Sequence, residues 1–308
     1  MTRVSDAEAL PAPWRRLIDD AAVFPPGDAA LPDAVAAYTA RRDEWYADLV
    51  ASFVVTDVRI SEVRASADGA SLPLSIVVTG GAGAIPGALG LAAKAGNPVA
   101  GLETALRDPD DPVGAARRVV AACDAARSEG LLDDDTPVYV EIPHVGATAG
   151  WLAAADVVAE NEFRLKFRTG GLEPHLFPAA HALAHWIDAA LDRETPFKCT
   201  AGLHHAIRHT SAEGVGEPVD QHGFLNVLLA TRQAFDGATT ADVVATLERR
   251  DGAGLAADAR DADLAGARRW FTSFGSCSVR DPLDDLVSLG LVSTGSTTDP
   301  TSSDAANR

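Results

Sequence analysis

Short apolar runs rich in β-branched and aromatic residues alternate with longer helical stretches from residue 52 onward. The runs cover residues 52–57, 72–81, 99–106, 137–143, 163–171 and 196–203, and helical stretches such as 112–132 and 177–194 lie between them. Strands that are separated by helices usually pair in parallel through βαβ units. The order therefore predicts an α/β fold, a (β/α) barrel of the TIM type, with a doubly wound open sheet as the second possibility.

The two ends of the chain fit this pattern less well. Residues 17–45 read as a loop containing Pro25 and Pro26, followed by a helix, and we expect them to cover one mouth of the barrel. After residue 210 the pattern is mainly helical, so the last strands give no clear signal, and short pieces such as "CSVR" (277–280) are candidates for closing an irregular barrel. We expect a single barrel domain over residues 1–292, with an N-terminal capping segment, and a disordered tail over 293–308.

Composition limits the partners. The chain has 308 residues, of which 47% are hydrophobic, and a formal net charge of −18, so it can bury a full core but would repel nucleic acid and anionic membranes. No apolar run has the length of a signal peptide or of a membrane helix, which predicts a cytoplasmic protein. Three cysteines far apart in sequence, Cys123, Cys199 and Cys277, predict free thiols.

Basic residues occur inside two of the predicted strands. Lysine supplies only three of the 26 basic residues, and two of these, Lys166 in "FRLKFRTGG" and Lys198 in "PFKCTAGL", fall in strands. A chain that otherwise uses arginine would need lysine there only for a role that a guanidinium group cannot fill.

Alternate residues of a barrel strand face the interior, so the strand pattern predicts which polar groups meet there. The predicted interior set is Glu103, Tyr139, Glu141, Arg164, Lys166, Arg168, Lys198, Thr200 and Gly202. A structural ion-pair network is one interpretation, because buried charges must be paired. An active site is the other, because barrel enzymes place their chemistry at the carboxyl ends of the strands.

A buried lysine beside a second cation has a lowered pKa and can form a Schiff base with a carbonyl group. Lys166 and Lys198 are the candidate amines, and Glu141 or Glu103 is the candidate proton shuttle. The leading hypothesis is a carbonyl-processing lyase or aldolase that acts on a small anionic substrate, phosphorylated substrates included, without a cofactor.

The turns that follow the strands predict where an anionic group would bind. Glycine lets backbone N–H groups approach an anion closely, and histidine and hydroxyl side chains can add hydrogen bonds. The candidate substrate-binding residues are Arg168, Thr169, Gly170, Gly171, Thr200, Gly202, His204, His205 and Ser276.

The pair "LKFRTGG" and "FKCTAGL" resembles the two lysine strands of class I deoxyribose-phosphate aldolases. The resemblance implies that Lys166 forms the Schiff base and that Lys198 lowers its pKa, although Arg168 stands where those aldolases have a small hydroxyl residue. Over most of the chain, "DDAAVFPPG", "KFRTGG", "FKCTAGLHH", "HGFLN" and "FGSCS" together resemble a bacterial family of uncharacterised activity, which implies no reaction.

Three other functions stay open. His204, His205 and His209, with Glu141 or His222, would suit a metal-dependent lyase or hydrolase if "HHAIRH" is helical. A non-catalytic barrel could hold an anion with Arg168, Lys198 and the glycine turns. Lysine and arginine would also suit the pyrophosphate of a phosphoribosyl-transferring barrel. Cys277 is a further candidate nucleophile, and the pattern specifies neither the substrate nor the oligomeric state.

Overall fold

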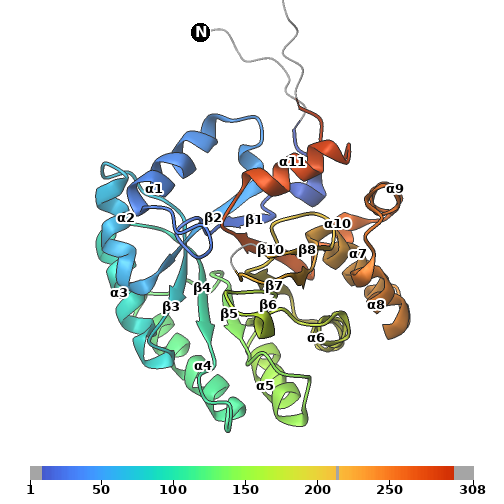
Figure 1. Cartoon of the computed structure of the whole chain (residues 1–308). Coiled ribbons are helices and arrows are strands. Elements are labelled where there is room, and N and C mark those ends of the chain that lie inside the picture. The colour runs from blue at the N-terminus through green and yellow to red at the C-terminus, as the bar shows by residue number, and fades with distance from the viewer. Residues whose placement is uncertain (1–8, 213–214, 295–308) are drawn as a thin grey trace, which may run out of the picture.

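The computed structural model describes residues 9–212 and 215–294, and within them eight parallel strands close into a barrel (Figure 1). This confirms the TIM-like barrel and excludes the open sheet. Around the barrel the strands are β1 (Ile18–Asp20), β10 (Phe271–Ser276), β7 (Phe197–Thr200), β6 (Arg164–Arg168), β5 (Val138–Glu141), β4 (Val99–Ala105), β3 (Leu74–Val78) and β2 (Val50–Thr56).

Helices surround the strands on the outside of the barrel (Figure 1). They are α1 (Leu31–Ala40), α2 (Ile60–Ser66), α3 (Ile85–Ala95), α4 (Pro112–Ser128), α5 (Ala149–Glu160), α6 (Ala180–Asp192), α7 (Phe224–Phe235), α8 (Thr240–Glu248), α9 (Gly252–Asp261), α10 (Leu264–Ala267) and α11 (Arg280–Ser288). The start of helix α4 follows from its sequence. Asp111 accepts a hydrogen bond from the Gly114 backbone N–H, and Pro112 occupies the first turn of the helix.

The closing strands are not where the sequence pattern placed them. Strand β1 lies inside the segment that reads as a loop, and β10 lies inside a stretch that reads as helical; "CSVR" is no strand, because α11 begins at Arg280. Strand β1 pairs with both β2 and β10 and so closes the barrel. It is only three residues long and two of them are aspartates, which removes the apolar signal of a buried strand.

The segment between β7 and β10 is mainly helical, as predicted, and contains α7, α8, α9 and α10. It also contains a two-stranded hairpin, β8 (His209–Ser211) and β9 (Val219–Gln221), that the sequence pattern did not indicate. Among the described residues, no helix combines the length and the apolar character needed to span a membrane. Residues 295–308 of the predicted tail lie outside the described part of the chain.

Aromatic side chains on the outer face of the strands pack beneath the helices. Phe167, Phe197 and Phe271 come from three adjacent strands, with ring centroids 4.8 Å and 5.5 Å apart, and all three are buried. Burying each such ring stabilises the fold by roughly 2–3 kcal/mol. Because the apolar residues face outward, the alternate residues of the same strands are directed into the barrel.

Candidate functional site

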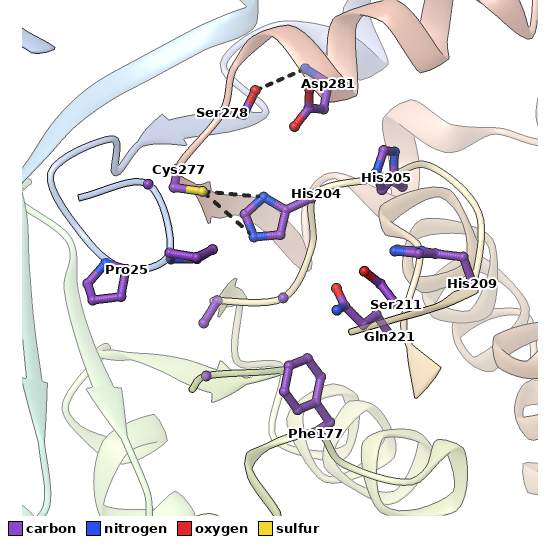
Figure 2. Close-up of a pocket in the computed structure, with 15 residues that line it drawn as sticks. Pro25, Phe177, His204, His205, His209, Ser211, Gln221, Cys277, Ser278 and Asp281 are labelled. Carbon is purple, nitrogen blue, oxygen red and sulfur yellow. Dashed lines mark hydrogen bonds between the residues drawn. The ribbon is translucent and has the colours of Figure 1, made fainter. Parts of the chain in front are cut away.

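The carboxyl ends of the strands surround a cavity of about 340 Å³. Its charged lining residues are Glu103, Lys166, Arg168, Glu173 and Lys198. Phe24 and Pro25, from the loop after β1, also line it. The predicted capping loop therefore does reach this mouth of the barrel. An adjoining cavity of about 230 Å³ includes His204 and Cys277, which line both spaces (Figure 2).

Strand register brings the predicted charged residues next to one another. Glu141 on β5 is paired with Lys166 on β6, and Lys166 is paired with Lys198 on β7. Neighbouring strands lie about 4.8 Å apart, so long side chains at paired positions meet inside the barrel. Glu103 on β4 also faces the interior, where it contacts both lysines.

These residues form a continuous ionic chain in which the charges alternate in sign. Lys198 Nζ lies 2.5 Å from Asp19 Oδ2 and 2.7 Å from Glu103 Oε1. Lys166 Nζ lies 2.8 Å from Glu103 Oε2 and 3.1 Å from Glu141 Oε2, and Arg168 Nε lies 2.7 Å from Glu141 Oε1. We call this series, Asp19, Lys198, Glu103, Lys166, Glu141 and Arg168, the ionic chain.

Mutual attraction outweighs burial in setting the charge states. Burial alone would lower the pKa of Lys198, but the carboxylates of Asp19 and Glu103 raise it above its ordinary value. Burial alone would raise the pKa of Glu103, but the ammonium groups of Lys166 and Lys198 lower it well below its ordinary value. The pKa of Glu141 is lowered in the same way, by Lys166 and Arg168. Lys198 and both glutamates are therefore charged at neutral pH.

The arrangement of the two lysines differs from the one that the resemblance implies. Lys198 does not act on Lys166 as an uncompensated neighbouring cation, because Glu103 lies between them and accepts from both. The member that sequence reasoning missed is Asp19, which also accepts hydrogen bonds from Ser52 and Ser273. In the sequence, Asp19 is marked only by the acidic pair that follows Ile18, and the strand that contains this pair is too short to recognise.

The histidines do not form the predicted helical cluster. Residues 204–208 are a loop and His209 begins β8, so His205 and His209 share no helix face. Their rings are in contact nonetheless, with centroids 4.7 Å apart, and His205 Nδ1 lies 3.1 Å from Asp285 Oδ2. His222 is buried, where its Nε2 donates to the Pro178 carbonyl. In the described ranges, no three or more His, Cys, Asp or Glu side chains are grouped so as to hold a metal ion.

Cys277 has the histidine neighbour that its sequence surroundings lack. Its Sγ lies 3.6 Å from His204 Nδ1, although the two residues are far apart in the chain, and Figure 2 shows the imidazole beside the sulfur. The thiol is partly exposed, whereas Cys123 and Cys199 are buried. Burial raises the pKa of Cys123 to about 12 and that of Cys199 further still.

Some of the predicted substrate-binding residues line the cavities and others support the turns. Gly171, Thr200, Gly202, His204 and His205 line one or both spaces. Thr169 and Ser276 are used internally: the Thr169 hydroxyl donates to the Ala201 carbonyl, and the Ser276 hydroxyl donates to the Ser278 carbonyl.

Gly170 and Gly202 lie in contact where the turns after β6 and β7 meet. A Cβ at Gly170 would lie 2.8 Å from the Gly202 Cα, and Gly202 has a φ of +74°. Only glycine allows both the close approach and the positive φ without strain. These two residues therefore let the turns after β6 and β7 lie in contact at the mouth of the barrel.

A scan of the chain against protein-family models finds no match, and a search of curated proteins finds no significant match. The resemblances seen in the sequence therefore stay predictions.

Proposed function

We propose that the protein is a carbonyl-processing lyase in which Lys166 forms a Schiff base with a small anionic aldehyde or ketone. The observation that supports this most directly is the position of the Lys166 amine. It lines the 340 Å³ cavity, and two carboxylates that can exchange protons with it, those of Glu103 and Glu141, lie within 3.1 Å. An amine, an acid-base partner and space for a substrate are the three requirements of Schiff-base chemistry.

Lys166 is a better candidate nucleophile than Lys198. The Lys198 side chain is 1% exposed, and its ammonium is held between Asp19 and Glu103. The Lys166 side chain is 5% exposed, and Lys166 lies nearer to Arg168, the exposed member of the ionic chain. Lys198 then has a positioning role, because it holds Glu103 against Lys166.

Glu141 is the candidate proton shuttle. Attack on a carbonyl requires the neutral amine, so Lys166 first passes a proton to Glu141. The amine adds to the carbonyl carbon, and the carbinolamine oxygen takes a proton and leaves as water, which produces the iminium ion. Glu141 suits this transfer better than Glu103, because its side chain is 12% exposed while that of Glu103 is 2% exposed.

The iminium ion then accepts the electron pair of the adjacent C–C bond. As that bond breaks, a carboxylate takes the proton of the β-hydroxyl group, so an aldehyde leaves and an enamine remains. Protonation of the enamine and addition of water release the second carbonyl product and restore Lys166. Arg168, one third exposed at the rim, would hold an anionic group of the substrate.

Borohydride trapping tests the proposal, and the chain supplies its own control. The protein would be incubated with acetaldehyde or pyruvate, reduced with sodium borohydride and mapped by peptide mass spectrometry. Lys94 lies exposed on α3 and reports non-specific labelling. We expect a reduced adduct on Lys166 in large excess over Lys94. Substituting Lys166→Arg, which keeps the charge, should remove it, and Lys94→Arg should not.

Equal labelling of Lys94 and Lys166, or no labelling of Lys166, would reject the Schiff base. The ionic chain would then be a structural network, and the non-catalytic anion-binding barrel would be the remaining interpretation. That barrel predicts a rise in melting temperature with an added anion and no turnover.

A further inference from the structure

A third cavity opens at the opposite end of the barrel, where the strands begin. Its volume is about 310 Å³, room for roughly ten water molecules. Ala51, Ala100 and Arg164 line it from the first residues of β2, β4 and β6. The three residues proposed to react with or hold the substrate, Lys166, Glu141 and Arg168, are not among its lining residues.

Four arginines line this cavity: Arg15, Arg16, Arg164 and Arg268. Asp19 is the single acidic lining residue, and its carboxylate is already engaged by Lys198, Ser52 and Ser273. Within the described residues, none of the four guanidinium groups is paired with a carboxylate. In a chain of net charge −18, this is a local excess of positive charge in a concave site.

Neutral groups hold two of these arginines in place. Arg164 Nη1 donates to the Tyr139 hydroxyl at 3.1 Å. Arg268 donates to the backbone carbonyls of Phe271 and Thr272 and, through Nη2, to those of Arg15 and Arg16, each at 3.1 Å. Burial lowers the pKa of Arg268 to about 10, so it stays charged at neutral pH. The guanidinium groups are thus positioned while their charge is not neutralised.

We propose that this cavity binds a small oxyanion carrying two or more negative charges, of the phosphate or polycarboxylate type. Planar guanidinium groups bind such oxygens through paired, charge-assisted hydrogen bonds. Lys198 lines both this cavity and the one at the other mouth, so a bound anion would lie beside the ionic chain. The site extends the proposed function but does not depend on it.

Calorimetric titration with inorganic pyrophosphate and with citrate, at low ionic strength, tests the proposal. The variants are Arg16→Gln, at an exposed position, Arg164→Gln and the double substitution. Arg117→Gln, at an exposed position on the outer helix α4, is the matched control. We expect saturable binding that weakens at least about tenfold with each of the first two substitutions and stays within about twofold in Arg117→Gln.

Tighter binding of pyrophosphate would assign the site to phosphate-bearing ligands, and tighter binding of citrate to carboxylates. The proposal fails if neither anion binds the wild-type protein saturably. It also fails if the double variant, shown by circular dichroism to be folded, binds as the wild type does. A loss in Arg117→Gln equal to that in Arg164→Gln would likewise overturn it, because binding would then follow the overall charge of the protein and not this cavity.

Discussion

Glu103 is the residue on which the ionic chain depends most, because it contacts both lysines and also accepts from Ser75. Replacing Glu103 with glutamine keeps the shape and removes the charge. It leaves two buried ammonium groups with half of their compensation, and breaking such a buried pair costs about 3 kcal/mol or more. We expect the free energy of unfolding to fall by at least that amount, as measured by urea denaturation.

Glu62→Gln is the control for this substitution. Glu62 pairs with Arg59 at 3.2 Å on the surface, where its side chain is 57% exposed. A pair of that kind contributes less than about 1 kcal/mol, because water screens it. If the two substitutions had equal effects, the charges of the ionic chain would not be tightly coupled.

Cys277 should be the reactive thiol of this protein. His204 lies close enough to accept its proton, and thiolates react with alkylating agents where thiols do not. We expect iodoacetamide at neutral pH to modify Cys277 and to spare Cys123 and Cys199, whose pKa values are raised by burial. Substituting His204→Gln should slow the modification roughly tenfold, as followed by mass spectrometry.

Cys277→Ser provides the control, since it should remove the label altogether. An unchanged rate in His204→Gln would show that the imidazole does not activate the sulfur. Labelling of Cys123, which is buried, at a similar rate would show that neither exposure nor the histidine limits the reaction.

At the scale of elements, the sequence predicted the strands in which apolar and polar residues alternate regularly, and it missed the two that lack this alternation. Strand β6 alternates Leu165 and Phe167 with cations, so both its existence and its orientation could be read. Strand β1 has only three residues. In β10, Phe271 and Phe274 both pack outside the barrel although they are three positions apart, because the register shifts between Phe271 and Ser273, and this spacing reads as helical.

The same difference explains how much of the candidate site could be predicted. Lys166, Lys198, Glu103 and Glu141 follow from alternation along recognised strands. Their partner Asp19 could not be found, because its strand was read as a loop. The sequence did not decide between a loop and a helix at His205, because the conformation there is set by a distant residue: Asp285 accepts from the Ala206 backbone and contacts His205.

For the molecule as a whole, the ionic chain does not cause loss of stability in mild acid. The lowered pKa of Glu103 makes its contribution complete above the unfolded value of roughly 4.3, and the raised pKa of Lys198 makes its contribution complete below roughly 10.4. Between these limits Glu103 and Lys198 contribute fully, so a change of stability between pH 7 and pH 5 comes from groups other than these two.

His222 is such a group. It is buried, and burial lowers its pKa to about 4, whereas the unfolded chain takes up a proton near pH 6.5. Below that pH the unfolded state binds more protons than the folded state, so stability falls as pH falls. From pH 7 to pH 5 the loss from this residue is about 2 kcal/mol. His144 and His209, whose pKa values are also lowered by burial, add losses of the same sign.

Substituting His222→Gln isolates the contribution of His222 to the pH dependence of stability. Glutamine can still accept from Arg208 and donate to the Pro178 carbonyl, but it does not titrate. Urea denaturation of both proteins at pH 7 and pH 5 gives the comparison. We expect the difference between the two pH values to be about 2 kcal/mol smaller in the variant. If the wild type and the variant lost the same stability, His222 would have to be protonated in the folded protein. Its contacts do not allow this, because the Arg208 guanidinium approaches the nitrogen that would take the proton.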